Sequence, residues 1–121
     1  MRENKIVKFN VKFIWLERRG HMKILLSCGA GMSSGFLANQ VRKAAKKLDV
    51  NVVCEAKSQA DVSSSIGDYD ILCLGPHLAY MKDSMEQLGK QYDVKIIVIP
   101  QSIYGALDGK ALLELCINEM K

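Results

Sequence analysis

Between Lys23 and Arg42 the sequence contains no lysine or arginine. The chain also has only two prolines, no low-complexity stretch and no internal repeat, which argues against long disorder. No apolar run approaches the roughly 18 residues that a membrane-spanning helix needs. The 121 residues, of which 49% are hydrophobic and 25% charged, therefore fit one ordinary globular domain with one core.

The formal charge of +4 does not indicate nucleic-acid binding, because it is confined to one end of the chain. Residues 1–21 hold six basic and two acidic residues, whereas residues 22–121 hold 11 of each. A neutral globular part has no basic patch for contact with a phosphate backbone. We therefore expect no nucleic-acid partner.

The first 21 residues differ in composition from the rest. Lysines interrupt their apolar positions, so the segment lacks the core of a signal peptide. Residues 17–20, Glu-Arg-Arg-Gly, are what a purine-rich ribosome-binding site yields when it is translated in frame. We expect residues 1–21 to be a non-native or disordered N-terminal extension and residues 22–121 to form the domain, with Met22 as the native start. A genuine short extension is the alternative.

The four cysteines form no CxxC pair and show no spacing typical of a metal site, so we expect no metal. Without a signal peptide, the expected compartment is a reducing cytoplasm. Cys54, Cys73 and Cys116 lie in apolar surroundings and are expected to be small buried residues. Cys28 differs from them, because it follows an apolar run and opens a glycine-rich segment.

Apolar runs of strand length alternate four times with segments of helical spacing. The runs are continuously apolar, which is typical of strands covered on both faces. This predicts an α/β fold, a small open four-stranded parallel sheet with helices on both faces. The strands are expected at residues 23–27, 51–57, 70–74 and 94–99. The helices are expected from an N-cap at Ser33 or Ser34 to about residue 48 and at 61–66, 79–92 and 110–120, with a loop bracketed by Gly105 and Gly109.

Ligands of parallel α/β sheets bind beyond the carboxyl ends of the strands, near the point where the strand order switches. Three segments are expected to meet there, residues 28–35, 75–80 and 101–108. The cations of the first helix are expected elsewhere, on its solvated face: Arg42, Lys43, Lys46 and Lys47.

The segment after the first strand has the form of a loop that binds an anion through backbone N–H groups. Its glycines permit close backbone approach, and N–H groups at the start of a helix attract negative charge. The same field lowers a thiol pKa, so Cys28 is expected to be the reactive thiol. A nucleophile in a phosphate cradle that lacks a cation suggests a carrier of phosphate rather than a hydrolase. The expected cradle comprises Gly29, Ala30, Gly31, Met32, Ser33, Ser34 and Gly35.

Rival phosphate-binding motifs fail at particular positions. A Walker loop needs a Gly-Lys-Ser/Thr sequence, which is absent. A dinucleotide fingerprint lacks its third glycine, since Ser34 stands there. A cysteine phosphatase would need arginine at the same position 34 to clamp the phosphate charge. A glycine-rich turn with an incidental cysteine remains an alternative.

Residues 24–34, Ile-Leu-Leu-Ser-Cys-Gly-Ala-Gly-Met-Ser-Ser, resemble the phosphorylation loop of the lactose/cellobiose-type IIB components of the bacterial sugar phosphotransferase system. Residues 74–81 resemble the segment after the third strand in that family. Residues 104–109 resemble its loop before the last helix. The resemblance covers about 100 residues from Met22 onward and does not specify the sugar.

The resemblance implies a mechanism and partners. A phosphohistidine of a IIA protein would pass its phosphoryl group to Cys28, which would donate it to a sugar held by a membrane IIC component. The sugar would be a β-linked disaccharide such as cellobiose or lactose, or a relative such as chitobiose. No metal or dissociable cofactor is implied. The protein itself would be a cytoplasmic monomer that meets the membrane only through IIC.

Several side chains near the expected edge are candidates for partner contact. His77 is a candidate for touching the phosphoryl group or a partner, with a plain surface histidine as the alternative. Asp108 is expected to cap the last helix rather than act in catalysis. Methionine and aromatic side chains suit adaptable interfaces, although core packing is an equal alternative. The expected rim comprises Met32, Tyr80, Met81 and Tyr104.

A second class of function stays open on the sequence alone. The same loop would suit a non-catalytic regulatory or binding module that senses phosphate or another anion. A redox role for Cys28 is weaker, because no resolving cysteine lies near it in sequence. The sequence identifies neither the sugar nor the cognate IIA.

Overall fold

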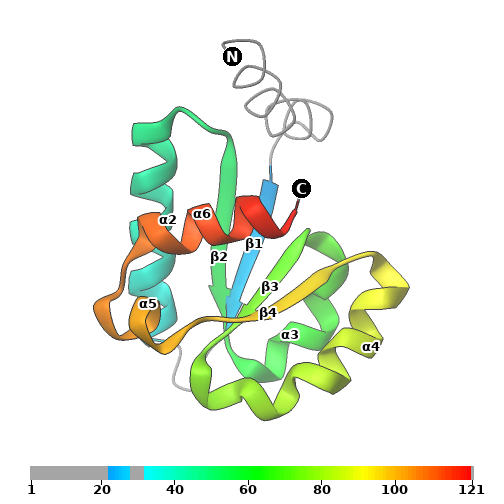
Figure 1. The fold of residues 1–121 in the computed structure, drawn as a ribbon. Helices are drawn as coiled ribbons and strands as arrows, with labels where there is room; N and C mark the ends of the chain where they lie inside the picture. The colour runs from blue at the N-terminus through cyan, green and yellow to red at the C-terminus, as the bar shows by residue number, and fades with distance from the viewer. Residues whose placement is uncertain (1–21, 28–31, 121) are drawn as a thin grey trace, which may run out of the picture.

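The computed structural model describes residues 22–27 and 32–120, which form a sheet covered by helices on both faces (Figure 1). The predicted extension 1–21 and the loop residues 28–31 lie outside the described residues. The strands are β1 (Met22–Ser27), β2 (Val52–Lys57), β3 (Ile71–Leu74) and β4 (Lys95–Val98). The helices are α2 (Met32–Leu48), α3 (Gln59–Ser65), α4 (Lys82–Tyr92), α5 (Gln101–Ala106) and α6 (Gly109–Glu119), with short 3₁₀ turns η1 (Ile66–Asp68) and η2 (Pro76–Met81).

The four strands form one parallel sheet in the order β2-β1-β3-β4, which confirms the predicted fold class. The register aligns the strand ends, since Ser27 pairs with both Lys57 and Leu74. Leu74 pairs in turn with Val98. All four carboxyl ends therefore lie level at one edge of the sheet, which is the lower edge in Figure 1.

Alternate residues along the strands belong to two hydrophobic clusters, one on each face of the sheet. Ile24 and Leu26 of β1 belong to the cluster under α2 and α6, whereas Leu25 belongs to the cluster under α3 and α4. Central strands buried on both faces explain the continuous apolar runs in the sequence. This two-sided core holds the carboxyl edge in a defined position.

The exposed edge of the sheet at β2 is partly closed by α2. The Arg42 guanidinium donates a hydrogen bond to the main-chain carbonyl of Cys54. A cation held against an edge strand hinders the addition of a strand from another chain. Arg42 is thus exposed as predicted for the solvated helix face, and it also has a contact that the sequence did not suggest.

Two boundaries differ from the sequence predictions. The prediction of Ser33 or Ser34 as N-cap is wrong, because the helical backbone already includes Met32. The loop predicted between Gly105 and Gly109 is present but short, since α5 continues to Ala106 and α6 begins at Gly109, and the sequence analysis missed α5 itself. Pro100 precedes this short helix, and Leu107 ends it in the left-handed conformation with φ 52°. A six-residue helix is too short for a periodic signal to appear, so the glycines alone suggested a loop.

A third difference concerns the helix predicted at 79–92. The structure divides this region into η2 and α4, and η2 is itself kinked at Leu78. Leu78 is buried in the cluster under α3 and α4, so packing of its side chain sets the kink. The segment after β3 is therefore held close to the sheet before α4 begins.

Asp108 caps α6 as predicted. Its carboxylate accepts a hydrogen bond from the Ala111 main-chain N–H at 3.1 Å. We expect Asp108→Ala to lower the free energy of unfolding by about 1 kcal/mol, because one helix N–H group loses its partner. Urea denaturation followed by circular dichroism measures this. Asp108→Asn should retain most of the stability, and an unchanged midpoint in Asp108→Ala would contradict the capping role.

Both ends of the described chain lie at the amino edge of the sheet, opposite the carboxyl edge. Met22 begins β1, and Met120 lies with Val94 and Lys95, at the start of β4. In Figure 1 the start of β1 and the end of α6 both lie on the upper side of the molecule, away from the ends of the strand arrows. Within residues 22–27 and 32–120, no helix is long and apolar enough to cross a membrane.

Candidate functional site

The carboxyl edge of the sheet gathers the segments that follow β1, β3 and β4. The chain leaves β1 toward β2 on one side and returns to β3 on the other, so β1 and β3 flank the point where the strand order switches. Ligands of open α/β sheets bind at this place. The Gly75 main-chain N–H donates to the Ser27 carbonyl at 2.9 Å, which joins the two segments at the switch point.

The predicted nucleophile and three of the seven residues of its predicted cradle lie outside the described residues. These are Cys28, Gly29, Ala30 and Gly31, which connect the end of β1 to the start of α2. The backbone of Met32, Ser33 and Ser34 forms the first turn of α2, and their side chains are not described. Gly35 is described, and apart from its chain neighbours and its own helix backbone no described atom lies within 4 Å of the place where a Cβ would stand. The side of α2 at Gly35 is therefore open.

The segments after β3 and β4 touch through two aromatic rings. His77 in η2 is exposed, and its ring centroid lies 5.9 Å from that of Tyr104 in α5, at an interplanar angle of 58°. Tyr104 also packs against the cluster under α2 and α6. The predicted candidates His77 and Tyr104 are thus brought together at the edge, and Tyr104 contributes to the core as well.

Of the other two described candidates for partner contact, Tyr80 is exposed and Met81 is packed against the core. Tyr80 is 73% exposed, and its hydroxyl accepts a hydrogen bond of 3.4 Å from the Gln59 side-chain amide. Met81 packs instead against the cluster under α3 and α4. Phe36 in the first turns of α2 is 50% exposed and was missed by the sequence analysis. Its helical spacing from Gln40 and Lys43 places it on an exposed side of α2, which is the signal that could have found it.

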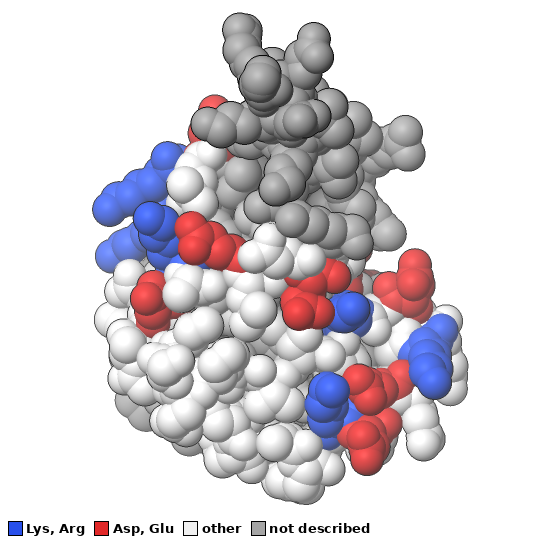
Figure 2. All heavy atoms as spheres, in the orientation of Figure 1, with Lys and Arg blue, Asp and Glu red and all other residues white. Residues whose placement is uncertain are grey.

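The edge is distinguished by a lack of charge. The stretches that enter and leave it from β1, β3 and β4, residues 24–41, 71–81 and 96–107, contain no aspartate, glutamate, lysine or arginine. Figure 2 shows an uncharged surface around α5, whereas charged side chains gather above it and toward α4. Depletion of charge with exposed aromatic side chains is typical of the centre of a protein–protein interface.

One cation and one buried hydroxyl at the edge were missed by the sequence analysis. Of the residues that end the four strands, only Lys57 is charged. Its partner in the register is Ser27, whose side chain is 1% exposed. The Ser27 Oγ has no hydrogen-bond partner within residues 22–27 and 32–120. Local sequence could not reveal this pair, because the register of β1 and β2 creates it.

The three remaining cysteines are buried, as predicted. Burial raises the pKa of the Cys54 thiol to about 12. Burial and a thiol contact of 3.5 Å with Cys116 raise the pKa of Cys73 well above its usual range. Since the thiolate is the reactive form, Cys54 and Cys73 are inert in the folded protein.

This difference predicts selective alkylation. Native protein treated with iodoacetamide near pH 8 should take up one label, at Cys28, because the other thiols are buried away from the reagent. Peptide mass mapping locates the label, and unfolding in urea should expose all four cysteines. Labelling of Cys54, Cys73 or Cys116 in native protein as fast as Cys28 would contradict the prediction.

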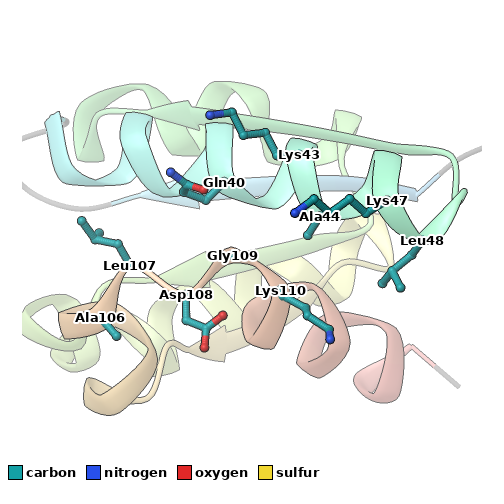
Figure 3. A pocket seen from close by; sticks show the side chains of 10 residues that line it. All are labelled: Gln40, Lys43, Ala44, Lys47, Leu48, Ala106, Leu107, Asp108, Gly109 and Lys110. Atoms are coloured by element: carbon teal, nitrogen blue, oxygen red, sulfur yellow. The ribbon is translucent and has the colours of Figure 1, made fainter.

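A pocket of about 540 Å³ lies elsewhere, between α2 and the turn that joins α5 to α6 (Figure 3). Its lining includes Lys43, Lys47 and Lys110. In Figure 3 the Lys43 and Lys110 side chains extend in opposite directions, so their charges do not converge on a ligand. Asp108 is already engaged as the cap of α6. The carboxyl edge therefore remains the better candidate site.

The described part of the chain offers no metal site, since no three histidine, cysteine, aspartate or glutamate side chains within it cluster suitably. Tyr69, which precedes β3 on the amino side of the sheet, donates a hydrogen bond to the Glu55 carboxylate. Burial, followed by this hydrogen bond, raises the pKa of Tyr69 above its usual range. Tyr69 is buried in the cluster under α3 and α4, which is a structural position.

Comparison with known proteins identifies similar chains. Residues 23–115 match the family model described as PTS system, Lactose/Cellobiose specific IIB subunit. The galactose-specific EIIB component of the PTS system from Lactococcus lactis subsp. cremoris is 32% identical over 102 residues, covering 80% of this chain and 94% of that protein. The lactose-specific EIICB component of Staphylococcus epidermidis is 30% identical over 93 residues, which are 75% of this chain and 16% of that protein.

The fold also occurs in a solved structure of a similar protein. The solution structure of the cellobiose-specific phosphotransferase IIB component from Borrelia burgdorferi has a TM-score of 0.66 and 34% sequence identity. The similarity covers 81% of this chain and 90% of that one. The names of these relatives carry three different sugars, so similarity alone assigns none of them to this chain.

Proposed function

The chain belongs to the lactose/cellobiose-specific IIB family of the PTS system, and from this premise we propose that it carries phosphoryl groups between two partner proteins. Cys28 accepts a phosphoryl group from a phosphohistidine of IIA and donates it to a sugar bound by the membrane IIC component. The activity is that of a protein-N(π)-phosphohistidine–sugar phosphotransferase with a phosphocysteine intermediate.

The two transfers balance without a metal or dissociable cofactor. In the first, the Cys28 thiolate attacks phosphorus, an S–P bond forms, and the N–P bond of phosphohistidine breaks with its electron pair returning to the imidazole. In the second, a sugar hydroxyl releases its proton to solvent and forms an O–P bond, while the S–P bond breaks with its electron pair returning to sulfur as the thiolate. Each step needs a nucleophile and a polarised phosphoryl group, which a thiolate and backbone N–H groups can supply.

The observation that carries the proposal is the arrangement of β1 and α2. The carboxyl end of the central strand β1 lies at the switch point of the sheet, and α2, a helix of 17 residues, is the next described element of the chain. The N-terminus of a helix stabilises anions through free N–H groups and the helix dipole. Within the proposal, Cys28 is the nucleophile. The phosphate ligands are the N–H groups and hydroxyls of Gly29, Ala30, Gly31, Met32, Ser33, Ser34 and Gly35.

The uncharged edge supports docking of both partners at the same surface. IIA and IIC must each bring a reacting group to Cys28, so they bind in turn. Exposed Phe36, Tyr80 and His77 with the adjacent Tyr104 offer apolar and aromatic contact without charge repulsion. Met32 and Met81 complete the proposed interface. Fusion of IIB and IIC in a similar EIICB protein supports IIC as a partner.

The remaining features of the proposal follow from this role. The chain acts as a cytoplasmic monomer and meets the membrane only through IIC. Its sugar is a β-linked disaccharide or a related sugar, in the range spanned by the galactose, lactose and cellobiose named for its relatives. The IIC component selects the sugar, because IIC holds it during transfer.

The test is the intact mass of the protein after incubation with phosphoenolpyruvate, the general phosphotransferase proteins and a cellobiose-type IIA. A gain of one phosphoryl group, mapped by fragmentation to Cys28, is the expected result. The modification should disappear when IIC and its sugar are added. If several IIA proteins that phosphorylate other IIB components leave this chain unmodified, the proposal fails and a phosphate-sensing binding module takes its place.

A further inference from the structure

A groove on the flank of the domain holds charges that the proposed function does not use. It is the pocket of about 540 Å³ between α2 and the turn that joins α5 to α6 (Figure 3). Its lining carries three lysines and a single aspartate, and that aspartate already caps α6. Within residues 22–27 and 32–120, none of the three lysines forms an ion pair. The groove therefore has an excess of positive charge, from Lys43, Lys47 and Lys110.

The floor of the groove is apolar. Ala44, Leu48 and Leu107 contribute to it. Leu48, the last residue of α2, is 41% exposed, which leaves a large aliphatic side chain open to solvent beside the lysines. Apolar surface bordered by charged side chains is typical of contact with another protein rather than of a site for a small anion.

The directions of the lysine side chains favour an extended ligand. Figure 3 shows Lys47 lying along α2 beside Ala44, whereas Lys43 and Lys110 leave the groove on opposite sides. Ammonium groups spread in this way cannot surround one small anion. They can each pair with a different carboxylate of a segment that lies in the groove. The ligand that fits is thus a polypeptide segment with several carboxylates around an apolar side chain.

The groove continues the uncharged carboxyl edge. Tyr104 of α5 belongs to that edge, and Ala106 and Leu107 at the end of the same helix line the groove. At a rise of about 1.5 Å per residue, Lys43 and Lys47 lie about 12 and 18 Å along α2 from Gly35 in its first turn. A protein that covers the edge and extends along α2 reaches both surfaces. A bilayer that faces the edge does not reach these lysines.

We propose, on the basis of the proposed function, that this groove binds an acidic segment of the IIA partner while the uncharged edge binds the surface around its phosphohistidine. Carboxylates of the segment pair with Lys43, Lys47 and Lys110, and an apolar side chain of the segment packs on Leu48. No covalent bond forms or breaks in the groove. The occupant is IIA rather than IIC, because IIC meets the edge from the membrane and the lysines stand back from that plane. Opposite charges on two separate proteins also speed their encounter.

The charged rim is tested with two double variants that remove the same charge. Lys43→Gln/Lys47→Gln removes two lysines of the groove, and Lys46→Gln/Lys90→Gln removes two exposed lysines that lie outside it. The first should lower the second-order rate constant of phosphoryl transfer from IIA about three- to ten-fold at low salt, and the loss should shrink as salt screens the charges. The second should stay near wild type. Equal losses in the two variants would reduce the effect to net charge and overturn the proposal.

The apolar floor is tested with Leu48→Gln. Loss of an apolar contact accelerates dissociation and is not screened by salt. We expect the dissociation rate from immobilised IIA to rise about two- to five-fold at both low and high salt, with an unchanged urea midpoint because the side chain is partly exposed. An unchanged dissociation rate would overturn the contact with Leu48.

The location is tested without phosphoryl transfer, by the amide chemical shifts of this chain on addition of unphosphorylated IIA. We expect changes over residues 40–48 and 106–110. If these changes occur and wild type accepts no phosphoryl group, the proposed function fails and the groove stands. If wild type is phosphorylated while IIA leaves these signals unchanged, only the groove is overturned. Changes at the same residues with phosphatidylglycerol vesicles and none with IIA would assign the surface to a membrane, and would also overturn the proposal.

Discussion

Cys28→Ser is expected to lower the rate of phosphoryl acceptance from IIA by about 10³-fold or more. A serine hydroxyl titrates far above the range of a thiol, so almost none of it is ionised in the conditions in which a thiolate forms. A phosphoserine, if it formed slowly, would also be a poor donor, because an alkoxide is a worse leaving group than a thiolate. Intact mass after incubation with phosphoenolpyruvate and the phosphotransferase proteins measures the loss.

The control for this prediction is His77→Gln. His77 is the other side chain at the carboxyl edge that could accept a phosphoryl group, and it is exposed, so the variant should fold. We expect His77→Gln to be phosphorylated at Cys28 and Cys28→Ser to be unmodified, with both retaining the wild-type circular dichroism spectrum. Phosphorylation of Cys28→Ser together with loss in His77→Gln would move the acceptor to His77 and refute the proposal.

The largest expected effect on stability comes from Gly109→Ala. A methyl group on Gly109 would stand 2.3 Å from the Gln40 carbonyl carbon and 2.5 Å from the Val41 main-chain nitrogen. Both atoms belong to the backbone of α2, so a side-chain rotation cannot relieve the overlap. Figure 3 shows Gly109 at the start of α6, facing the α2 segment that carries Gln40. The two helices must separate, and we expect a loss of at least about 2 kcal/mol in the free energy of unfolding.

Gly105→Ala is the matched control for this loss. Gly105 lies in α5, and its nearest contact with an added methyl group would be the Gln101 side-chain amide at an ordinary 3.6 Å. Alanine favours a helix over glycine by about 0.5–1 kcal/mol, so the variant should be as stable as wild type or more stable. Urea unfolding of the two variants compares them directly. Equal stability of Gly109→Ala and wild type would mean that α2 and α6 can move apart without cost.

The sequence predicted the fold where a signal extends over a whole element. Continuous apolar runs such as residues 23–27 and 70–74 identified buried strands, because a strand covered on both faces needs apolar residues at successive positions. The helical spacing of Leu37, Val41 and Ala44 identified α2 for a similar reason. The predicted boundaries were wrong where they depend on a single helical turn, as at the start of α2 at Met32 and in the six-residue helix α5. Neither the strand order nor the register could be derived from single runs.

The sequence predicted which segments form the candidate site. It did not predict which residues of neighbouring strands lie side by side there. Ligands of open α/β sheets bind beyond the carboxyl ends of the strands, so we expected the segments after β1, β3 and β4 to meet there. The ring contact of His77 with Tyr104 confirms that two of these segments meet. The absence of a cation between Lys23 and Arg42 suggested a phosphoryl carrier rather than a hydrolase. Lys57 lies 30 residues from Ser27 in the chain and becomes its neighbour only through strand pairing. Such a neighbour is a property of tertiary structure.

The position of Met22 and Met120 at the amino edge also bears on how the domain can be tethered. A linker attached at either point leaves from the side opposite the uncharged edge, so it need not cross the surface that partners would occupy. Tethering raises the effective concentration of one module near another without a new contact. The similar EIICB protein joins the two modules in a single polypeptide. A linker at the amino edge would therefore leave the carboxyl edge accessible, so a domain tethered in this way could still bind its partners there repeatedly.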